Sequence, residues 1–478
     1  MNTKPDEDAK ALIQKAYIFA EKAHETQKRA SGEPYVVHVF ETTKNLARYE
    51  MDATTISAGL LHDVLEDTEV TRDEMQKEFG EDIVHLVESV TKLGKIKYKG
   101  DERRVESMRK FFVAVADDFR VLMIKLSDRL HNLKTLEHVR PEKQKRIALE
   151  SIDVYAALAN RLGIGKLKGE LEDAAFPFAY PKEYNTVETL LKERTENNQK
   201  YLESVKDALL GELGKQQIPV VKIDYRIKHK YSLWKKLQKY EMDIEKIYDI
   251  LAIRIIVENI ELCYRVLGLV HSIWKPLPGR IKDYIALPKL NGYQSIHTTI
   301  FTGDGGIVEI QIRTPEMHGQ AEYGIASHFS YKKRTESTQE NKKFQWINDF
   351  KKLNDKEAEQ INFFDTLKKD LLTDRIFIFT PLGDIIDLPE DSSPIDFAYA
   401  VHSEIGNKTA SAKVNGKMAP LSTKLHSGDI VEIVTNKNAN PASKWLDYAK
   451  TGLAKRHINS YIKENSLLSR FLSFGNKN

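Results

Sequence analysis

The segment from Gly59 to Thr68 reads Gly59-Leu60-Leu61-His62-Asp63-Val64-Leu65-Glu66-Asp67-Thr68, so a histidine and three carboxylates interrupt a run of apolar residues. In a helix, His62 and Glu66 would be i,i+4 neighbours, as would Asp63 and Asp67, and the four polar groups would project from one side. Imidazole and carboxylates at the mouth of an apolar helix suit a divalent metal ion that activates water. The alternative is a plain helix start whose acidic residues favour the helix dipole.

Two further segments favour the metal site. Upstream, Arg29-Ala30-Ser31-Gly32-Glu33-Pro34-Tyr35-Val36-Val37-His38 contains a Gly-Glu-Pro turn that places its last histidine one turn into a new helix. Downstream, the apolar run that begins at Val121 predicts a core helix ending near Asp128 and Asn132. The candidate ligands are His38, His62, Asp63 and Asp128. Two imidazoles and two carboxylates fit manganese or iron better than a thiolate zinc site.

Three motifs in this order carry a family resemblance. RASGEPYVVH, LLHDVLEDT and LSDRLHNLKTL resemble the HD phosphohydrolases, and together they resemble the hydrolase domain of the RelA/SpoT family, which makes and destroys the alarmone (p)ppGpp. The resemblance implies an all-α domain with Mn²⁺, in which Glu66 and Asp67 orient or deprotonate the attacking water. It also implies that Arg29 packs on the guanine base and that Asn132 lies near it. Departures from the family pattern are Thr26, Ala30 and Val39.

The totals of the chain limit its class. It has 478 residues, a net charge of +3 and 30% charged residues, which predicts several cores and a near-balanced surface. Cys263 is the single cysteine, so an internal disulfide framework is excluded. The polar N-terminus and the lack of a long apolar run predict a cytoplasmic protein without a membrane segment.

The first part of the chain predicts helix after helix, from about residue 8 to about residue 175. Glycines and lysines between Lys92 and Asp101 interrupt this pattern and predict a basic loop, either a surface connection or a contact to a phosphate-rich substrate. We therefore expect a hydrolase domain over 1–180. Long helices over 181–214 would link it to the next domain.

Short apolar runs with β-branched residues follow, and they predict a mixed α/β domain over 215–335. Its expected strands include Ile250 to Val257, Tyr284 to Ala286 and Ile307 to Ile312. Asp249 precedes the first of these strands, and a carboxylate there is costly unless it binds a metal or a partner. Glu309 alternates with apolar neighbours and shares its strand face with Gln311 and Arg313. Two carboxylates on separate strands, ringed by Lys and Arg, suit nucleotidyl or pyrophosphoryl transfer.

These pieces resemble the nucleotidyltransferase-like synthetase domain of the RelA/SpoT family, which moves pyrophosphate from ATP to the 3′-hydroxyl of GDP or GTP. The resemblance implies Mg²⁺ on Asp249, a base or second metal carboxylate at Glu309, and Tyr293 stacked on the acceptor guanine. It places Arg226, Lys228 and Lys236 near ATP, and Lys289, Asn291 and His297 toward the acceptor. Tyr225 replaces a usual glycine, and Arg280-Ile281-Lys282-Asp283 looks like the basic variant of bifunctional members.

The remaining chain predicts a helical linker over 336–373, a small α+β module over 374–437 and the start of a helical region over 438–478. The module contains a strand and turn at Arg375 to Asp384, a capped helix from Ser393 and a hairpin at Val414 to Lys417. It resembles the ubiquitin-like TGS domain, which in ribosome-associated relatives touches uncharged tRNA. His402 matches the contacting histidine, and a structural histidine is the alternative.

The sequence leaves three functional hypotheses. The favoured one is a bifunctional enzyme that makes and hydrolyses (p)ppGpp, with two activities that oppose each other conformationally. The second is a hydrolase whose synthetase module only senses nucleotides, which Tyr225 alone favours. The third is a ribosome-binding adaptor with idle sites, and two complete carboxylate sets argue against it. The chain ends soon after the TGS-like module, as either a truncated or a naturally short member would.

Overall fold

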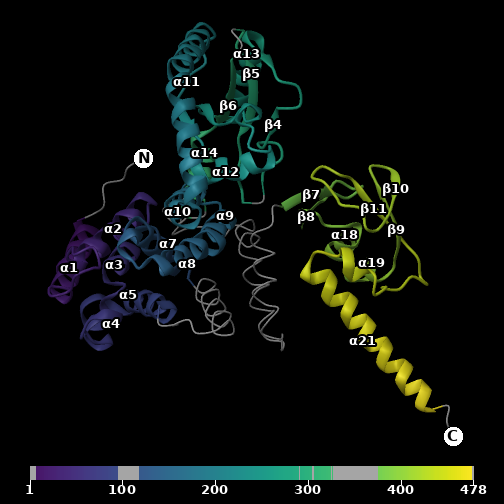
Figure 1. Ribbon diagram of the computed structural model, residues 1–478, viewed down its shortest axis with the longest axis horizontal. Helices are drawn as coiled ribbons and strands as arrows, with labels where there is room; N and C mark the ends of the chain where they lie inside the picture. The colour runs from purple at the N-terminus through teal and green to yellow at the C-terminus, as the bar shows by residue number, and fades with distance from the viewer. Residues whose placement is uncertain are drawn as a thin grey trace. The chain divides into compact units, whose positions relative to one another are not determined.

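The computed structural model describes residues 7–94, 118–289, 291–303, 306–324, 326 and 375–475. The chain divides into two compact units, Met1–Ile361 and Asn362–Asn478. Each is described by itself, with the elements labelled in Figure 1. Most of the basic loop expected at Lys92 to Asp101, and the linker expected over 336–373, lie outside the described residues. Within the described part, no helix combines the length and the hydropathy needed to cross a bilayer.

The first part of unit 1 consists of helices alone in its described residues, which confirms the predicted all-α domain. The helices are α1 (Glu7–Ala23), α2 (Tyr35–Arg48), α3 (Ala53–Leu61), α4 (Val64–Asp67), α5 (Arg72–Gly94), α7 (Phe119–Lys134), η1 (Leu136–His138), α8 (Pro141–Glu150), η2 (Ser151–Ala156), α9 (Ala157–Arg161) and α10 (Gly165–Ala179). The central helix is α7, whose apolar residues Leu122, Met123 and Ile124 are fully buried. Because α2, α5 and α10 all pack on it, α7 fixes the positions of their polar side chains.

The segment from Gly59 to Thr68 is not one continuous helix. A turn at His62 and Asp63 separates α3 from α4, and Asp63 has φ −99° and ψ −7°. Asp63 nevertheless accepts hydrogen bonds at its carbonyl oxygen from the backbone N–H groups of Glu66 and Asp67. The helix considered for this segment is therefore interrupted at His62 and Asp63, and helical hydrogen bonding restarts at Asp63.

The rest of unit 1 combines a long helix with a mixed sheet, as predicted. Its elements are α11 (Pro181–Lys215), β1 (Lys222–Ile227), α12 (Lys230–Lys239), η3 (Ile244–Lys246), β2 (Leu251–Ile256), α13 (Ile260–Ile273), β3 (Lys275–Pro276), β4 (Lys282–Asp283), β5 (Ile296–Phe301), β6 (Ile307–Arg313) and α14 (Pro315–Tyr323). The strand order is β1-β2-β6-β5-β3, and β4 pairs with β5. Among the described strand pairs of this sheet, only β2 and β6 are parallel.

Two local features of the sheet matter for the site. Ala252 on β2 lies opposite Glu309 on β6. Asp249 precedes the first residue of β2 by two positions, near the same end of this parallel pair. The strand expected at Tyr284 to Ala286 is wrong, because these residues form a turn. The carboxylate of Asp283 accepts hydrogen bonds from the backbone N–H groups of Ile285 and Ala286, at 2.9 Å each, and so favours a turn over a strand.

Unit 2 is a small α+β module followed by helix, which confirms the predicted class. Its elements are β7 (Arg375–Phe379), β8 (Ile385–Pro389), α18 (Pro394–Val401), α19 (Ser403–Asn407), β9 (Thr409–Val414), β10 (Lys417–Ala419), β11 (Val431–Thr435), α20 (Trp445–Tyr448) and α21 (Gly452–Gly475). Ser393 and Asp396 form a capping box on α18. Asn415 and Gly416, both with positive φ, make the expected hairpin turn between β9 and β10.

Candidate functional site

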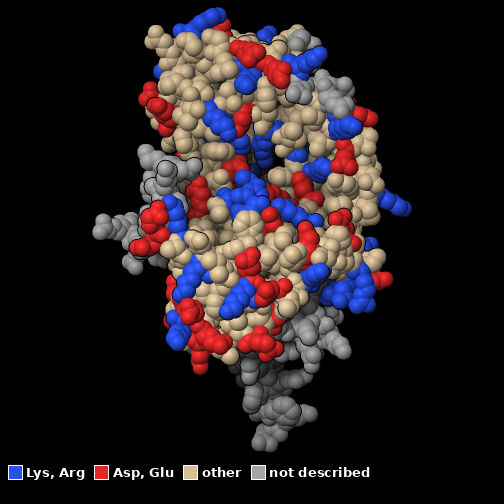
Figure 2. All heavy atoms as spheres, turned by 90° about the vertical axis from the view of Figure 1, so that its left-hand side faces the viewer, with Lys and Arg blue, Asp and Glu red and all other residues tan. Residues whose placement is uncertain are grey.

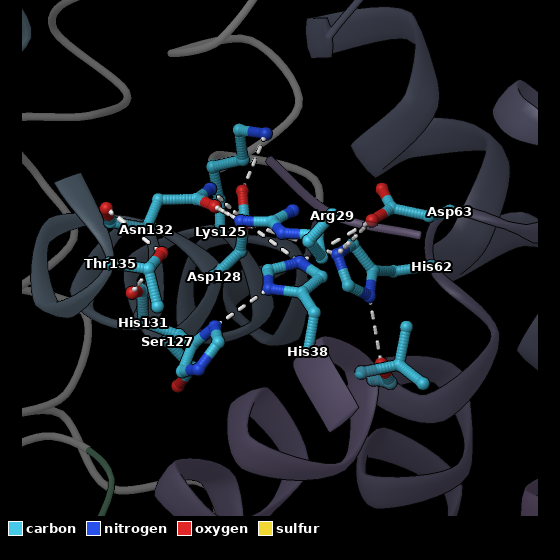
Figure 3. A network of polar contacts seen from close by, with 12 residues as sticks. Arg29, His38, His62, Asp63, Lys125, Ser127, Asp128, His131, Asn132 and Thr135 are labelled. Carbon is cyan, nitrogen blue, oxygen red and sulfur yellow. Dashed lines mark hydrogen bonds and ion pairs between the residues drawn. The ribbon is translucent and has the colours of Figure 1, made fainter. Parts of the chain in front are cut away.

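Four of the predicted ligands meet in one buried cluster. His38 comes from α2, His62 from the end of α3, Asp63 from the following turn and Asp128 from α7. Nε2 of His38 lies 3.4 Å from Asp63 Oδ2 and 3.4 Å from Asp128 Oδ1. Nε2 of His62 lies 3.1 Å from Asp63 Oδ2 and 4.0 Å from Asp128 Oδ1. Figure 3 shows these side chains, which come from separate segments, turned toward a common centre.

The cluster fits a divalent metal ion. Ligand atoms of His38, His62 and Asp128 all lie within 4.8 Å of one another, and the three residues are buried. Nε2 of His62 is buried, and its 3.1 Å contact to Asp63 Oδ2 lacks hydrogen-bond geometry, so the atom is available to a metal ion. The donors are nitrogen and oxygen, and Asp63 offers a further oxygen close to both imidazoles.

Contacts behind the cluster orient the two imidazoles. Nδ1 of His62 lies 2.8 Å from the carbonyl oxygen of Gly59, and Nδ1 of His38 lies 2.8 Å from Nδ1 of His131. Each Nε2 is thereby directed to the centre. If Nε2 of His38 binds a metal ion, its Nδ1–H donates to Nδ1 of His131, which must then accept as a neutral imidazole. Burial, with the neighbouring His38 and Arg29, lowers the pKa of His131 to about 4.

The charges of the cluster are mutually stabilised. Burial opposes the imidazolium of His62, but Asp63 and Asp128 outweigh it and raise its pKa to about 9. Burial likewise opposes both carboxylates, yet the histidines hold the pKa of Asp63 well below its usual range. The ammonium of Lys125 lies 3.0 Å from Asp128 Oδ2 and lowers the pKa of Asp128 well below its usual range. A bound cation would replace the proton on His62 as the positive partner.

The predicted water-orienting and base-binding residues border this cluster. Glu66 and Asp67 are exposed on α4, and the Tyr35 hydroxyl lies 2.8 Å from both Asp67 Oδ2 and Asp63 Oδ2. Arg29 Nη2 donates to Asn132 Oδ1 at 2.6 Å, and the Asn132 amide donates in turn to Asp128. The guanidinium of Arg29 also lies over the ring of Tyr35.

The second site is a cavity of about 460 Å³ between the sheet and the end of the helical domain. It is lined by basic side chains from both parts of unit 1: Lys166, Lys168, Arg226, Lys228, Lys236, Lys246, Arg254, Arg280, Lys282, Lys289 and Arg313. Figure 2 shows Lys and Arg side chains gathered around a hollow in the face that it draws. Such a lining suits a ligand that carries several phosphates.

Asp249 lies in this cavity with two of the predicted lysines. The ammonium groups of Lys228 and Lys236 each lie 2.8 Å from Asp249 Oδ2. Burial opposes the carboxylate, but the two lysines lower its pKa well below the ordinary value. The other oxygen, Oδ1, is buried and makes no hydrogen bond. An ionised carboxylate with one unsatisfied oxygen fits a magnesium ligand.

Glu309 lies in the same cavity within a chain of polar contacts. Its Oε1 lies 3.1 Å from His297 Nδ1 and accepts a hydrogen bond of 2.7 Å from Gln311. Nε2 of His297 lies 2.7 Å from the hydroxyl of Tyr293. Burial opposes the charge on Glu309, but His297 and Gln311 outweigh it and lower the pKa.

The remaining predicted residues also line the cavity. The ammonium of Lys289 lies 4.6 Å from the ring centre of Tyr284 and 5.3 Å from that of Tyr293. The side-chain oxygen of Asn291 accepts a hydrogen bond from the backbone N–H of Tyr293. Its side-chain amide donates to the carbonyl oxygen of Asn160 at 3.4 Å. Tyr225 does not line the cavity, because its ring lies beneath Lys206 of α11.

His402 lies in unit 2 and is exposed. It is the N-cap of α19, where its Nδ1 accepts a hydrogen bond from the backbone N–H of Glu404 at 3.2 Å. The other ring nitrogen is left for solvent or a partner.

Sequence reasoning missed several residues at these sites. Tyr35 and His131 contact the cluster of His38, His62, Asp63 and Asp128, and both stand inside the quoted motifs, which was a usable signal. Gly163, Lys166 and Lys168 line the second cavity from the end of the helical domain. No local pattern marks these three residues, because most of the cavity lining comes from Arg226 onward, in a later part of the chain.

Comparison with protein families finds three matches in order. An HD domain matches residues 16–165, a region found in RelA/SpoT proteins matches residues 225–336, and a TGS domain matches residues 376–435. Among solved structures, a metazoan ortholog of SpoT covers 28% of this chain and 73% of its own, at 30% identity and a TM-score of 0.23.

Curated relatives match almost the whole chain. Guanosine-3′,5′-bis(diphosphate) 3′-pyrophosphohydrolase of Aquifex aeolicus is 45% identical over 97% of this chain, GTP pyrophosphokinase of Myxococcus xanthus is 43% identical over 96%, and the bifunctional (p)ppGpp synthase/hydrolase SpoT of Escherichia coli is 41% identical over 96%. The chain spans 66%, 61% and 66% of their respective lengths. With its HD, RelA/SpoT and TGS regions in that order and this identity along its length, the chain belongs to the RelA/SpoT family.

Proposed function

We propose that this chain is a bifunctional alarmone enzyme. It transfers pyrophosphate from ATP to the 3′-hydroxyl of GDP or GTP, and it hydrolyses (p)ppGpp to GDP or GTP and pyrophosphate. The observation that carries the proposal is the presence of two chemically distinct sites in one unit: a His/Asp cluster fit for a metal ion, and a cation-lined cavity with two carboxylates. We assign hydrolysis to residues 1–180 and synthesis to residues 215–335.

In the hydrolase site, His38, His62, Asp63 and Asp128 would hold Mn²⁺, which suits a mixed nitrogen and oxygen set. The ion would supply Lewis acidity and a water of lowered pKa. Glu66 and Asp67, exposed one turn beyond the ligands, would orient that water or take its proton.

The substrate base would bind beside Arg29 and Asn132. Their mutual hydrogen bond presents a planar guanidinium next to an amide, and the amide is tied to Asp128. A guanidinium can stack on a purine, while an amide can read its edge. This arrangement would place the 3′-phosphates toward the metal-binding cluster.

In the synthetase site, Asp249 would hold Mg²⁺ on the phosphates of ATP, with Arg226, Lys228 and Lys236 around them. The acceptor oxygen forms a bond to the β-phosphorus of ATP, the bond from that phosphorus to the α–β bridging oxygen breaks, and AMP leaves. Glu309 would take the proton of the acceptor hydroxyl, or hold a second metal ion, with His297 beside it.

The acceptor guanine would stack on Tyr293, whose hydroxyl is held by His297. Lys289 and Asn291 border the same side of the cavity and would bind the acceptor's phosphates and sugar. Stacking on an aromatic face contributes about 1–3 kcal/mol per base, so Tyr293→Ala should weaken acceptor binding measurably.

Unit 2 would add an RNA contact. We propose that His402, exposed at the start of α19, touches uncharged tRNA when the protein engages the ribosome. The competing role is the helix cap that His402 already provides. His402→Asn keeps a capping acceptor, so loss of tRNA binding without loss of stability in this variant would favour the RNA contact.

The test is a pair of turnover assays on purified protein. With ATP, GDP and Mg²⁺ we expect AMP and ppGpp, and with ppGpp and Mn²⁺ we expect GDP and pyrophosphate. Glu309→Gln should lose synthesis alone, whereas Asp63→Ala or His62→Ala should lose bound metal and hydrolysis alone. Each variant is thus the control for the other. Absence of both conversions in the wild-type protein would favour an adaptor with idle sites.

Two further variants separate ligands from catalysts. Glu66→Gln and Asp67→Asn should retain the metal ion and lose hydrolysis, because the water would lack its base. Metal content by elemental analysis, measured beside turnover, decides the matter. Metal loss in either variant would show that the residue is a ligand.

A further inference from the structure

Helix α10 joins the two catalytic parts of unit 1 by direct packing. It contacts α7 and α8 of the helical domain and also α12 and α14 beside the synthetase cavity. The approach is close: a Cβ on Gly169 would overlap the ring of His229, and one on Gly165 would lie 2.6 Å from the carbonyl oxygen of Ala321. A side chain at either point requires a neighbour to move: the ring of His229 at Gly169, or the backbone at Ala321 at Gly165.

Asp173 on α10 makes two directed contacts across this seam. Its Oδ2 lies 2.8 Å from Nδ1 of His229, and its Oδ1 accepts a hydrogen bond of 3.0 Å from the backbone N–H of Tyr231. His229 is the N-cap of α12, and its own side chain makes no capping hydrogen bond. Asp173 therefore supplies the acceptor that a capping residue ordinarily provides, and its negative charge lies at the favourable end of the helix dipole.

The end of α12 that Asp173 holds leads directly to the cationic groups of the cavity. Lys228 precedes the helix and Lys236 lies on it, and both ammonium groups are 2.8 Å from Asp249. The rings of Tyr231 and Trp234 also pack on Phe176 of α10, at 5.4 Å between ring centres. Apolar packing of this kind tolerates small shifts, whereas two hydrogen bonds to one carboxylate fix the position of the helix start.

We infer that Asp173 is a positioning residue for the synthetase site: by capping α12 from the neighbouring helix, it holds Lys228 and Lys236 where the triphosphate donor binds. This inference rests on the proposed synthetase function and deepens it. It makes the geometry of the donor side depend on a helix that also packs against the helical domain.

The test compares three variants of the full chain. Asp173→Ala removes both contacts, and Asp173→Asn keeps an amide oxygen that can accept from Tyr231 N. Glu170→Ala is the matched control on the same helix, because Glu170 instead contacts Arg48 and Tyr49 of the helical domain. We expect Asp173→Ala to raise KM for ATP about tenfold, with KM for GDP and ppGpp hydrolysis close to wild type. Asp173→Asn should show a smaller rise, and Glu170→Ala should leave KM for ATP unchanged.

Affinity for a non-reactive ATP analogue, measured beside the thermal midpoint, separates positioning from general stability. Selective loss of analogue affinity in Asp173→Ala supports the inference, even if the wild-type protein makes no ppGpp. Absence of ppGpp synthesis by the wild-type protein would refute only the proposed synthetase function. An unchanged KM and analogue affinity in Asp173→Ala overturns the inference. An equal loss of ATP affinity, GDP affinity and ppGpp hydrolysis would also overturn the inference. If Asp173→Ala fails to fold, Asp173→Asn provides the same measurement.

Discussion

His131 orients the ring of His38 in the candidate metal cluster, although it is not a predicted ligand itself. Its Nδ1 contacts Nδ1 of His38, and it lies buried behind that ring. We predict that His131→Ala lowers metal affinity about 10–100-fold, because outer partners of ligating histidines contribute about that much. Metal titration of the purified protein measures the effect. His138→Ala, at a partly exposed histidine outside the cluster, should leave the affinity unchanged; equal affinity in both variants would contradict the orienting role.

Lys289 gives the synthetase site a predicted pH dependence. Although much of its side chain is exposed, desolvation by the cavity and the neighbouring Lys282 and Arg226 lower its pKa to about 8. Phosphates bind the protonated amine, so affinity for GDP should be full below about pH 8 and fall as the pH rises through it. In Lys289→Arg the side chain stays charged, so this fall should disappear. GDP affinity measured at increasing pH for the wild-type and Lys289→Arg proteins checks both expectations. If the affinity falls in the same way in both proteins, another group causes the fall.

At the residue scale, sequence reasoning succeeded where a motif carries the chemistry. It placed His38, His62, Asp63 and Asp128 in one candidate site, and the structure brings them together. It did not identify Asp173, whose partners His229 and Tyr231 lie 56 and 58 residues away. A single polar contact between two elements leaves no periodic signal in the local sequence, unlike the apolar face of a helix.

The seam between α10 and α12 makes a prediction at the scale of elements. Gly169→Ala should displace the ring of His229 and lower synthesis about tenfold, because a Cβ at this position overlaps the imidazole. Gly211→Ala on α11 is the control, since a Cβ there meets nothing within 4 Å. It should stabilise the protein by about 0.5–1 kcal/mol without changing synthesis. Turnover and denaturant unfolding measure both, and normal synthesis in Gly169→Ala would show that the seam can relax.

Element prediction failed where local hydrogen bonds overrode apolar pattern. The carboxylate of Asp283 turns the chain at Tyr284 to Ala286, although the three residues alone favour a strand. The chain between α3 and α4 turns at His62 and Asp63, although the periodicity continues through it. Long helical patterns were predicted correctly, as for the 35-residue helix α11, because the helix does not depend on any single residue.

At the scale of unit 1, the two proposed catalytic sites share one connecting element, α10. The sequence suggested that helices over 181–214 border both domains. In the structure α11 packs mainly on α10, α12 and α13, whereas α10 contacts the helical domain and α12 alike. If α10 had two positions, each favouring one site, the protein would not run both reactions at once. It would then not waste ATP by making and hydrolysing ppGpp together. Adjacency alone does not establish such coupling, which requires a measured free energy between the sites.

Linkage supplies that measurement. If synthetase substrates favour a conformation with a poor hydrolase site, ppGpp bound at the hydrolase site must weaken ATP binding by the same factor, typically about 5–150-fold. We predict this effect for a non-reactive ATP analogue bound to metal-loaded Glu66→Gln protein, which should hold ppGpp without cleaving it. Repeating the titration with Tyr293→Ala exposes any ppGpp that occupies the synthetase cavity directly, and Asp173→Ala should reduce the coupling if α10 transmits it. Equal analogue affinity with and without ppGpp, at an occupied hydrolase site, would mean that the two sites act independently.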